Sequence, residues 1–504
     1  MLNNQFIELK RRLLEINDLN SALAILTWDQ ATMMPPGGAA ARGRQMATLK
    51  KLAHEHFVDP RLGELLESLK DLEKDLAHDS WEAALIRVTR KDYDKAVRVP
   101  PEFMARFASH SSSTYEAWIK AKAANDFKSL VPCLEKTLDL SREYSGYFSG
   151  AEHIADPLID NVDDGFKAKM VSVLFDELRR ELVPLVKIIA ERPLVDEMPV
   201  RGRYEVAKQL AFGEDVIRRF GYDFSRGRQD KTHHPFMIKF SLGDVRITTR
   251  YKDDDVTDCL FSTMHEAGHA MYEQGVSSDF EGTPLARGTS MGVHESQSRL
   301  WENLVGRSRD FWNHFYPKLS DAFPDPLKNI SVDQFYRIIN KVEPSLIRTD
   351  ADEVTYNLHV MIRFDLELAL LEDKLKVKDM PDAWNSRYQK DLGVTPPNDS
   401  LGVMQDVHWH ADFIGGQFQC YTLGNILSAQ FFEAAVKANP TVPADIGRGE
   451  FATLRNWLTT NLYRHGSVFD ASEIVKRVTG KDLTIAPYMT YLKKKYGGLY
   501  GLKL

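Results

Sequence analysis

The residues best suited to chemistry in this chain lie close together in the stretch MHEAGHAMYEQG, residues 264–275. His265 and His269 are four residues apart, so on a helix both imidazoles project from one face and can bind one metal ion. Glu266 is turned by about 100° from His265 and can stand beside the ion without binding it. Zinc lowers the pKa of a bound water to about 7, and a neighbouring glutamate can then take the proton of that water. The alternative interpretation is an ordinary helix that carries two surface histidines.

A catalytic zinc ion usually has three protein ligands, so the two histidines predict a third ligand downstream. The segment GVHESQSRLWENLVGRS (292–308) offers Glu295, near the start of a further predicted helix. His294 is the alternative ligand in the same segment. Glu295 could also be an ordinary acidic residue of a first helical turn, which the helix dipole favours. Because it follows a two-histidine helix, we favour Glu295 as the ligand.

A β-hairpin and a helix are expected to position the two histidines. The segments FMIKFS (236–241) and VRITTRY (245–251) are rich in β-branched and aromatic residues and flank a turn that contains glycine, which predicts the hairpin. The helix that follows ends at Gly275. The candidates for its N-terminal cap are Asp255, Thr257 and Asp258.

Most of the remaining chain has the periodicity of amphipathic helices. Residues 5–28 place apolar side chains mostly three and four positions apart, and a PPGG break precedes a second helical segment over 39–57. A further long helix is predicted near Asp350, which has capping-box spacing with Glu353. No linker or repeat divides the chain, so we expect a single domain over 1–504.

The composition excludes several classes of protein. The 504 residues are 43% hydrophobic and 27% charged, as in ordinary globular proteins. The net charge is −7 and no basic cluster is present, which excludes a nucleic-acid partner. No apolar run approaches the roughly 20 residues that span a bilayer, so we expect no membrane partner. The N-terminus does not look like a secretion signal, and the spacing of Cys133, Cys259 and Cys420 favours reduced thiols, which predicts a cytoplasmic protein.

Eight short motifs of this chain resemble those of the carboxypeptidase Taq family of metallocarboxypeptidases. Six follow the order of that family: HPF at 234–236, DVRIT at 244–248, HEAGH at 265–269, HESQSRLWEN at 294–303, IRTDADEVTY at 347–356 and GVMQDVHW at 402–409. The other two are WDQATMMPPGGAAARGRQ at 28–45 and PYMTYLKKKYGGLYG at 487–501. The resemblance covers nearly the whole chain, and the shared order makes it specific.

The resemblance implies a mainly α fold, like that of neurolysin and angiotensin-converting enzyme. Two lobes would flank a deep groove, with the N-terminal helices over it and a small β-sheet beside the metal helix. The resemblance also implies a homodimer that removes single residues from peptide C-termini with broad specificity. It implies one zinc or cobalt ion held by His265, His269 and Glu295, with Glu266 as general base and acid.

A carboxypeptidase has to recognise the free C-terminal carboxylate of its substrate. Arginine suits this task because its planar fork can bind both carboxylate oxygens. We expect Arg348, in IRTDAD, to do so, and Arg246, in DVRIT, is the second choice. The alternatives are structural ion pairs, of Arg348 with Asp350 or Asp352 and of Arg246 with Asp244.

Further residues are candidates for binding or polarising the substrate. The strand at 244–250 is expected to align the extended peptide through main-chain hydrogen bonds, or else to pack as ordinary sheet. His408 and the Tyr421 hydroxyl are candidate donors to the oxyanion. The stretch GGQFQCYTLG at 415–424 departs from the family pattern, because it is one residue longer and lacks a tyrosine and a proline. His234, in HPF, is either a substrate contact or a structural residue.

Two other functions remain open from the sequence. The same helical scaffold could carry an endopeptidase or a dipeptidyl carboxypeptidase. The alternative outside the enzymes is a helical binding protein whose metal site is vestigial.

Overall fold

Helices build almost the whole chain in this computed structural model, which describes residues 4–503. The helix predicted over 5–28 is α1 (Asn4–Thr32), and the second predicted helix is α2 (Ala39–Phe57). Both helices, and the mainly α fold class, are confirmed. Within the described residues, no helix has the length and apolar composition of a membrane span.

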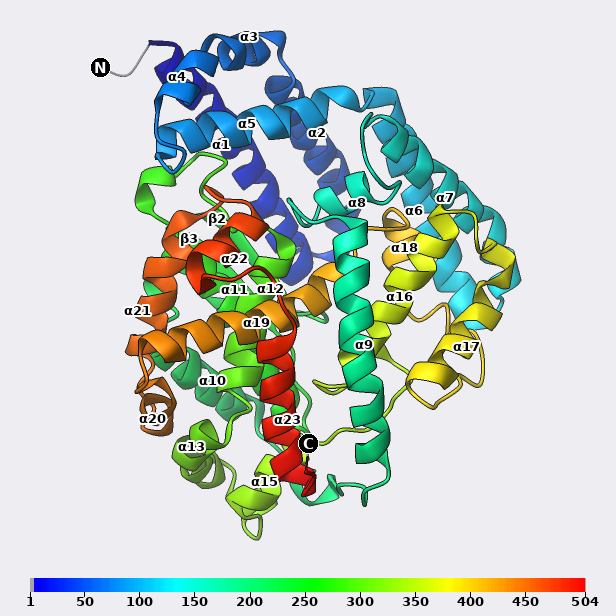
Figure 1. Cartoon of the computed structure of the whole chain (residues 1–504), viewed down its shortest axis with the longest axis vertical. Coiled ribbons are helices and arrows are strands. Elements are labelled where there is room, and N and C mark those ends of the chain that lie inside the picture. The colour runs from blue at the N-terminus through cyan, green and yellow to red at the C-terminus, as the bar shows by residue number, and fades with distance from the viewer. Residues whose placement is uncertain (1–3, 504) are drawn as a thin grey trace.

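The first half of the chain wraps around one end and one side of the molecule. Helices α1 to α5 gather at the end where the N-terminus lies, and α9 is a long helix near the middle of the view (Figure 1). The helices after α2 are α3 (Pro60–Ser68), α4 (Lys70–Asp75), α5 (Trp81–Arg98), α6 (Pro101–Ala124), α7 (Val131–Gly146), α8 (Asp156–Asp160), α9 (Ala168–Ala190) and α10 (Val206–Phe220).

The second half of the chain supplies the buried centre and the opposite end. Helices α13 and α15 and the C-terminus lie far from the N-terminal helices (Figure 1). The helices are α11 (Val256–Gly275), α12 (Met291–Arg299), α13 (Arg309–Ala322), α14 (Pro324–Leu327), α15 (Val332–Ile339), α16 (Tyr356–Leu371), α17 (Met380–Asp391), α18 (His408–Ala411), α19 (Gln419–Ala438), α20 (Val442–Gly447), α21 (Ala452–Asn461), α22 (Ala471–Thr479) and α23 (Ala486–Tyr500).

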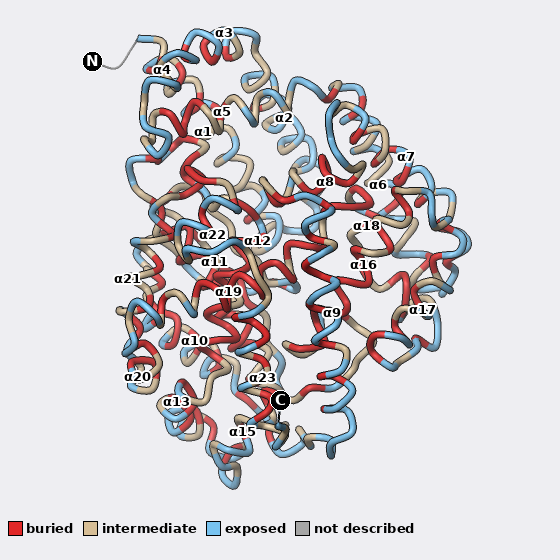
Figure 2. The backbone as a smooth tube through the Cα atoms, in the orientation of Figure 1, coloured by how far each residue is buried: buried red, intermediate tan, exposed pale blue. Residues whose placement is uncertain are grey.

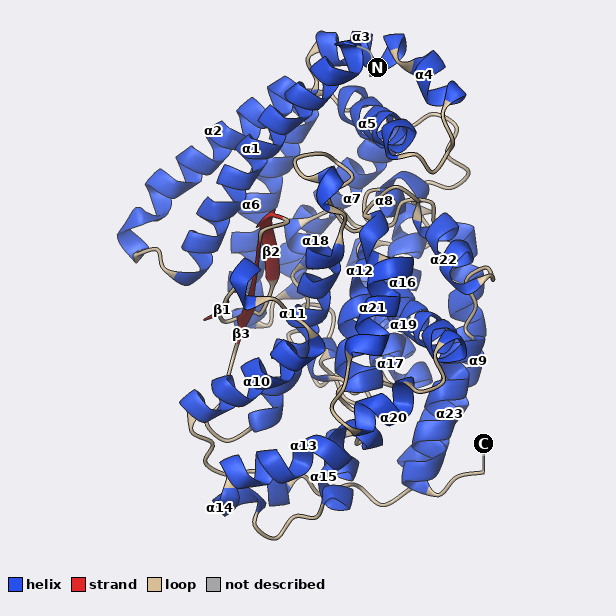
Figure 3. Ribbon diagram, turned by 90° about the vertical axis from the view of Figure 1, so that its left-hand side faces the viewer, coloured by secondary structure: helices blue, strands red, loops and turns tan. Residues whose placement is uncertain are grey.

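A small sheet lies beside α11 (Figure 3). Its strands are β1 (Gln229–Lys231), β2 (Met237–Ser241) and β3 (Asp244–Thr249). β2 and β3 form the predicted antiparallel hairpin, which is confirmed. β1 pairs in parallel with β3, so β3 is the central strand. β1 was not predicted because its residues, QDK, carry no β-propensity signal.

Helices α11, α12 and α19 form the buried centre of the molecule, where the tube is mostly red (Figure 2). Two glycines let α12 approach its neighbours closely. A Cβ at Gly268 of α11 would lie 2.6 Å from the carbonyl oxygen of Gln297, and a Cβ at Gly424 of α19 would lie 2.5 Å from Cγ of Glu295. Close backbone approach of this kind requires glycine. It holds the segment around Glu295 between two helices.

The helix predicted from Asp350 begins later, at Tyr356. The expected capping box between Asp350 and Glu353 is wrong. The Glu353 carboxylate instead accepts a hydrogen bond from Lys495 of α23 at 2.7 Å. Asp352 accepts the backbone hydrogen bonds at this turn. Glu353, which local spacing assigned to the helix cap, thus binds a lysine of a distant helix instead.

Candidate metal centre

The two histidines of HEAGH lie on one face of α11. Asp255 caps this helix and accepts a hydrogen bond from the Thr257 backbone N–H at 2.9 Å, as one of the three cap candidates. The ring centroids of His265 and His269 are 5.0 Å apart. Both Nε2 atoms face the same carboxylate, that of Glu295 on α12.

Glu295 completes a set of three ligand atoms. Its Oε2 lies 3.5 Å from His265 Nε2 and 3.3 Å from His269 Nε2, and the three ligand atoms all lie within 4.8 Å of one another. Ligand atoms about 2.0–2.1 Å from a tetrahedral zinc ion are roughly 3.3 Å apart. Two imidazoles and one carboxylate also form a donor set that zinc hydrolases use. The residues present therefore fit the metal that the sequence predicts.

Neighbours on α12 hold the Glu295 carboxylate in one orientation. Arg299 Nε donates a hydrogen bond to Oε1 at 2.7 Å, and Ser298 Oγ donates to Oε2 at 3.0 Å. Burial disfavours the charge of Glu295, but Arg299 and the two histidines outweigh it and keep its pKa well below the ordinary value. Glu295 is thus ionised, with Oε2 turned toward the histidines.

Two further residues fix the ring orientation of the histidines. Glu302, in a π-helical segment after α12, accepts a hydrogen bond from His265 Nδ1 at 2.9 Å. His294 Nδ1 lies 2.6 Å from His269 Nδ1. A partner on Nδ1 leaves Nε2 for a metal ion. His294 therefore lies behind a ligand, so its assignment as the alternative ligand is wrong. Sequence reasoning missed Glu302, although it lies seven residues after Glu295 and thus on the same helical face.

Glu266 lies beside the three ligand groups and is not one of them. Its side chain is buried. Burial raises the pKa of Glu266 to about 7, with the charge of Glu295 adding to the increase and that of His265 opposing it. A carboxylate with a pKa near neutrality can both accept and return a proton at neutral pH.

Arg348 is buried in the short turn before α16, and its partner is a distant aspartate. Asp406 accepts hydrogen bonds from Nε and Nη2, the shortest at 2.7 Å. The ion-pair partner of Arg348 is thus Asp406, and neither Asp350 nor Asp352, the two alternatives that the sequence offered in the same motif. Nη1 donates to the Tyr356 hydroxyl at 3.0 Å. These bonds use three of the five N–H donors, and the two others lie on the terminal nitrogens, where a carboxylate can bind.

Arg246 forms the ion pair that the sequence analysis named as its alternative. Nε and Nη2 each donate to one oxygen of Asp244 at 2.8 Å, and the guanidinium lies over the ring of Phe240. The prediction that 244–250 aligns the substrate along a free strand edge is wrong, because β1 and β2 flank β3 on both sides. The outer edges of this sheet belong to β1 and β2.

His408, Tyr421 and His234 come together from three segments. His408 Nε2 lies 3.3 Å from the Tyr421 hydroxyl, and the Arg348 guanidinium lies 5.1 Å from the centroid of the Tyr421 ring. Burial lowers the pKa of His408 to about 4, and the charges of Arg348 and His234 add to this effect. Burial raises the pKa of Tyr421, whose hydroxyl therefore keeps its proton. A neutral imidazole and a hydroxyl donor thus lie beside Arg348.

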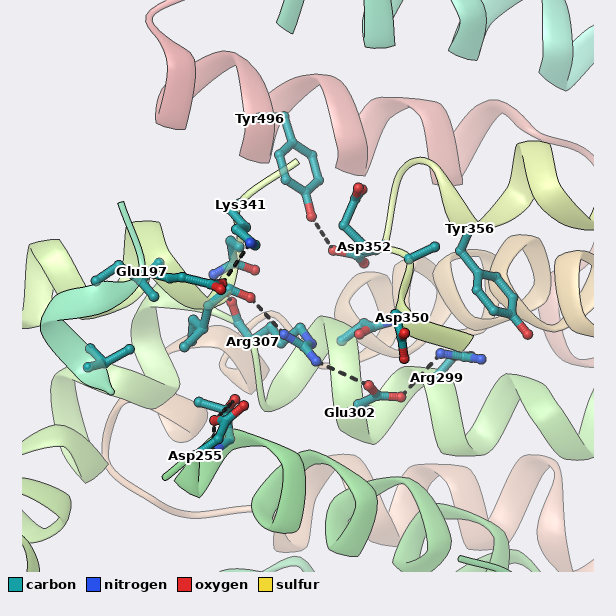
Figure 4. A pocket seen from close by; sticks show the side chains of 18 of the residues that line it. Glu197, Asp255, Arg299, Glu302, Arg307, Lys341, Asp350, Asp352, Tyr356 and Tyr496 are labelled. Atoms are coloured by element: carbon teal, nitrogen blue, oxygen red, sulfur yellow. Dashed lines mark hydrogen bonds and ion pairs between the residues drawn. The ribbon is translucent and has the colours of Figure 1, made fainter. Parts of the chain in front are cut away.

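A polar cavity of about 240 Å³ adjoins the candidate metal centre through Arg299 and Glu302, which contact Glu295 and His265 (Figure 4). Arg299 and Glu302 line it, together with Arg307 and Lys341, whereas the three ligand residues do not. Arg299 and Arg307 reach Glu302 at 3.3 and 3.4 Å. The carboxylate that orients His265 is therefore held by two cations in the cavity wall.

Comparison with known proteins assigns the chain to a family. The family model of the carboxypeptidase Taq (M32) metallopeptidases matches residues 8–496. The chain belongs to this family. It is 40% identical over 495 residues to thermostable carboxypeptidase 1 of Thermus thermophilus, with 96% of both chains covered. It is 36% identical over 498 residues to carboxypeptidase 1 of Bacillus subtilis, with 98% of both chains covered.

A solved structure supports the same assignment. The crystal structure of the M32 carboxypeptidase from Deinococcus radiodurans R1 matches with a TM-score of 0.96 and 48% identity, over 99% of this chain and 100% of that one. The chain is thus an M32 metallocarboxypeptidase that acts on peptides and uses a divalent metal. The resemblance seen in the sequence motifs is confirmed, and the alternative of a binding protein is set aside.

Proposed function

We propose that this M32 metallocarboxypeptidase releases single C-terminal residues from peptides at one zinc ion held by His265, His269 and Glu295. The observation that carries the proposal is the separation of Glu295 Oε2 from the two Nε2 atoms, 3.5 and 3.3 Å, beside the buried Glu266. These residues would hold a divalent ion, which when bound would supply Lewis-acid chemistry for acidifying water and polarising the scissile carbonyl. Cobalt suits the same donors, so metal availability decides between the two ions.

Glu266 serves as general base and then as general acid. Its pKa of about 7 allows it to take a proton from the attacking water and to deliver that proton to the leaving amine. The protonated hydroxyl of Tyr421 and the neutral His408 are the proposed donors to the developing oxyanion. These donors act in the transition state, where negative charge builds up on the carbonyl oxygen.

Arg348 holds the C-terminal carboxylate of the substrate on the edge of its guanidinium that Asp406 and Tyr356 leave open. Arg363 also donates to Asp406, at 2.5 Å, which fixes the carboxylate that orients Arg348. An anchor one residue beyond the scissile bond limits cleavage to the last residue. The exposed His234 is a proposed contact near the entrance, and Arg246 serves mainly through its pair with Asp244.

Family membership supports the proposals on the groove, the dimer and the specificity, whereas the cysteine spacing supports the cytoplasm and the absence of a linker supports one domain. Residues 1–504 act as one domain in which the N-terminal helices cover a deep groove between two lobes. The protein works in the cytoplasm as a homodimer, with broad specificity for the released side chain. Light scattering after size-exclusion chromatography tests the dimer, and a mass equal to one chain would contradict it.

Mass spectrometry of a peptide digest tests the proposed activity. We expect a ladder of products that lose one C-terminal residue at a time, and an amidated peptide should resist cleavage because Arg348 has no carboxylate to bind. Metal-stripped enzyme should be inactive and should recover with zinc or cobalt. Internal fragments, or release of dipeptides, would instead indicate the endopeptidase or dipeptidyl carboxypeptidase alternatives.

A further inference from the structure

A chain of hydrogen bonds leads away from His269 on the side opposite Glu295. His294 Nδ1 lies 2.6 Å from His269 Nδ1, and His294 Nε2 lies 2.9 Å from Glu273 Oε1. Glu273 Oε2 in turn lies 2.5 Å from Lys239 Nζ. The side chains are largely enclosed: 11% of His294, 5% of Glu273 and 20% of Lys239 is exposed. The reaction steps proposed above do not use this series of hydrogen bonds.

Each hydrogen bond in the chain has one possible direction when His269 Nε2 binds a metal ion. A neutral imidazole carries one N–H, so a free lone pair on Nε2 places the His269 proton on Nδ1. That N–H donates to His294 Nδ1, which must then be an acceptor. His294 therefore carries its own proton on Nε2 and donates it to Glu273. Glu273 accepts from His294 at Oε1 and from Lys239 at Oε2, and because both of its oxygens accept hydrogen bonds it is a carboxylate.

Lys239 provides the positive charge that keeps Glu273 an acceptor. The Gly288 backbone N–H also donates to Glu273, at 2.9 Å, but it carries no net charge. Lys239 Nζ additionally donates to the carbonyl of Ala286, which anchors the ammonium between β2 and this loop. A buried carboxylate without a cation is strongly disfavoured. A neutral carboxyl could donate to His294, and the reversed chain would place a proton on the metal-binding nitrogen of His269.

We propose that Lys239 is a positioning residue for the metal: through Glu273 and His294 it fixes the tautomer of His269 that leaves Nε2 free for a divalent cation. Lys239 lies on β2, opposite Val245 of β3. The hydrogen bonds from Lys239 to His269 therefore connect the small sheet with α11, the helix that carries both histidines. The inference deepens the proposed function, because it rests on the metal site assigned there. The tautomer of His265 needs no such series of hydrogen bonds, because its Nδ1 contacts the Glu302 carboxylate directly.

Zinc affinity, measured by competition with a chromophoric chelator, tests this inference. We expect K239M to bind zinc about tenfold more weakly than the wild type, which is the range for loss of an outer partner of a ligand. In an E273Q background the same change should have no further effect, because Lys239 acts through Glu273. The matched control is K231M, which removes an exposed lysine of β1 and should leave the affinity unchanged.

Nitrogen-15 NMR of the histidines in metal-free protein adds a readout that simple loosening of the fold would not move. The wild type should carry the His269 proton on Nδ1, and K239M should shift it toward Nε2. Zinc affinity of K239M within about twofold of the wild type, or an equal loss in both backgrounds, would overturn the inference.

A second comparison decides the matter if K239M alone does not fold. The doubly neutral K239M/E273Q variant carries no unpaired buried charge in the chain, so it can be compared with E273Q. Zinc affinity of E273Q about tenfold below that of the wild type, with no further loss in the double variant, supports the role of Lys239 through Glu273. Wild-type affinity in E273Q, or weaker binding by the double variant than by E273Q, contradicts it. A wild-type protein without stoichiometric zinc would contradict the proposed metal site instead, which is a separate outcome.

Discussion

Glu266 and Glu367 show how burial gives two glutamates different roles. Burial raises the pKa of Glu266 to about 7, beside the proposed metal ligands, so that it can exchange a proton at neutral pH. Burial raises the pKa of Glu367 in α16 to about 8, against the opposing hydrogen bonds from Trp409 and Gly415. Glu367 is therefore mostly neutral at pH 7. The first carboxyl group suits proton transfer, and the second suits a buried hydrogen bond.

Replacing Glu266 by glutamine should separate catalysis from metal binding. E266Q should bind zinc like the wild type, because Glu266 is not a ligand, while kcat falls by about 10²–10⁴-fold through loss of the proton acceptor. Elemental analysis and steady-state kinetics on one peptide measure both effects. E177Q, at an exposed position of α9, is the control and should keep full activity. Near-normal turnover in E266Q would rule out this role.

Glu367 should make the stability of the protein depend on pH. Its folded-state pKa of about 8 exceeds the ordinary value of 4.5, so the stability it contributes is full below pH 4.5 and is lost as pH rises through 8. The free energy of unfolding should fall by at most about 1.4 kcal/mol per pH unit in this window through this group. Urea unfolding at several pH values should show that E367Q lacks this part of the decrease. Parallel curves for E367Q and the wild type would contradict the assignment.

The candidate metal centre depends on how closely three helices pack. α12 carries Glu295 and is held between α11 and α19 by contacts at Gly268 and Gly424. The ligand distances are therefore fixed by helix packing as well as by the ligands themselves. The π-helical segment after α12 places Glu302 against His265, an arrangement often found at functional sites.

A methyl group at Gly424 should disturb the metal site from the helix behind it. The added Cβ would lie 2.5 Å from Cγ and 2.7 Å from Cβ of Glu295, so the ligand has to shift. We expect G424A to lose about 1–3 kcal/mol of unfolding free energy and to bind zinc more weakly. Urea unfolding and chelator competition measure these losses.

The control for this variant is G498A in α23. A Cβ at Gly498 meets no atom within 4 Å, so this helical substitution should be neutral or slightly stabilising. Unchanged zinc affinity in G424A, or an equal loss in both variants, would show that the Gly424 contact does not hold Glu295.

The folded molecule as a whole brings the site together from distant parts of the chain. The three proposed ligand groups come from α11 and α12, whereas Arg348 lies before α16 and Tyr421 lies in α19. The unfolded chain has no such arrangement. Metal binding should therefore be linked to folding of the whole protein.

Removal of the metal should lower the thermal stability of the protein. Zinc at 100 times its dissociation constant should stabilise the folded state by about 2.7 kcal/mol, because it binds the folded state alone. Calorimetry of chelator-treated protein with increasing zinc should show a rising Tm. Magnesium should shift Tm less, since it prefers oxygen ligands. A Tm that does not respond to zinc would contradict a site formed by His265, His269 and Glu295.

Several features could be predicted from the sequence because they depend on local geometry. The helical repeat alone places His265 and His269 on one face, and apolar periodicity predicts α1 and α2. The hairpin β2–β3 follows from β-branched residues around a glycine turn. The cap expected at Asp350 was wrong because a residue of a remote helix, Lys495, takes its partner Glu353.

The sequence by itself determined the family and the mainly α fold and predicted the candidate metal ligands, because motif order, periodicity and i, i+4 spacing are properties of the chain. Only the tertiary structure decided which residues support the site. Asp406 lies 58 residues from Arg348, and β1 and β2 flank β3, the strand that was expected to align the substrate. The chain from Lys239 to His269 likewise joins a strand and two helices. Hydrogen bonds between such distant segments leave no periodic signal in the sequence and exist only after the helices have packed.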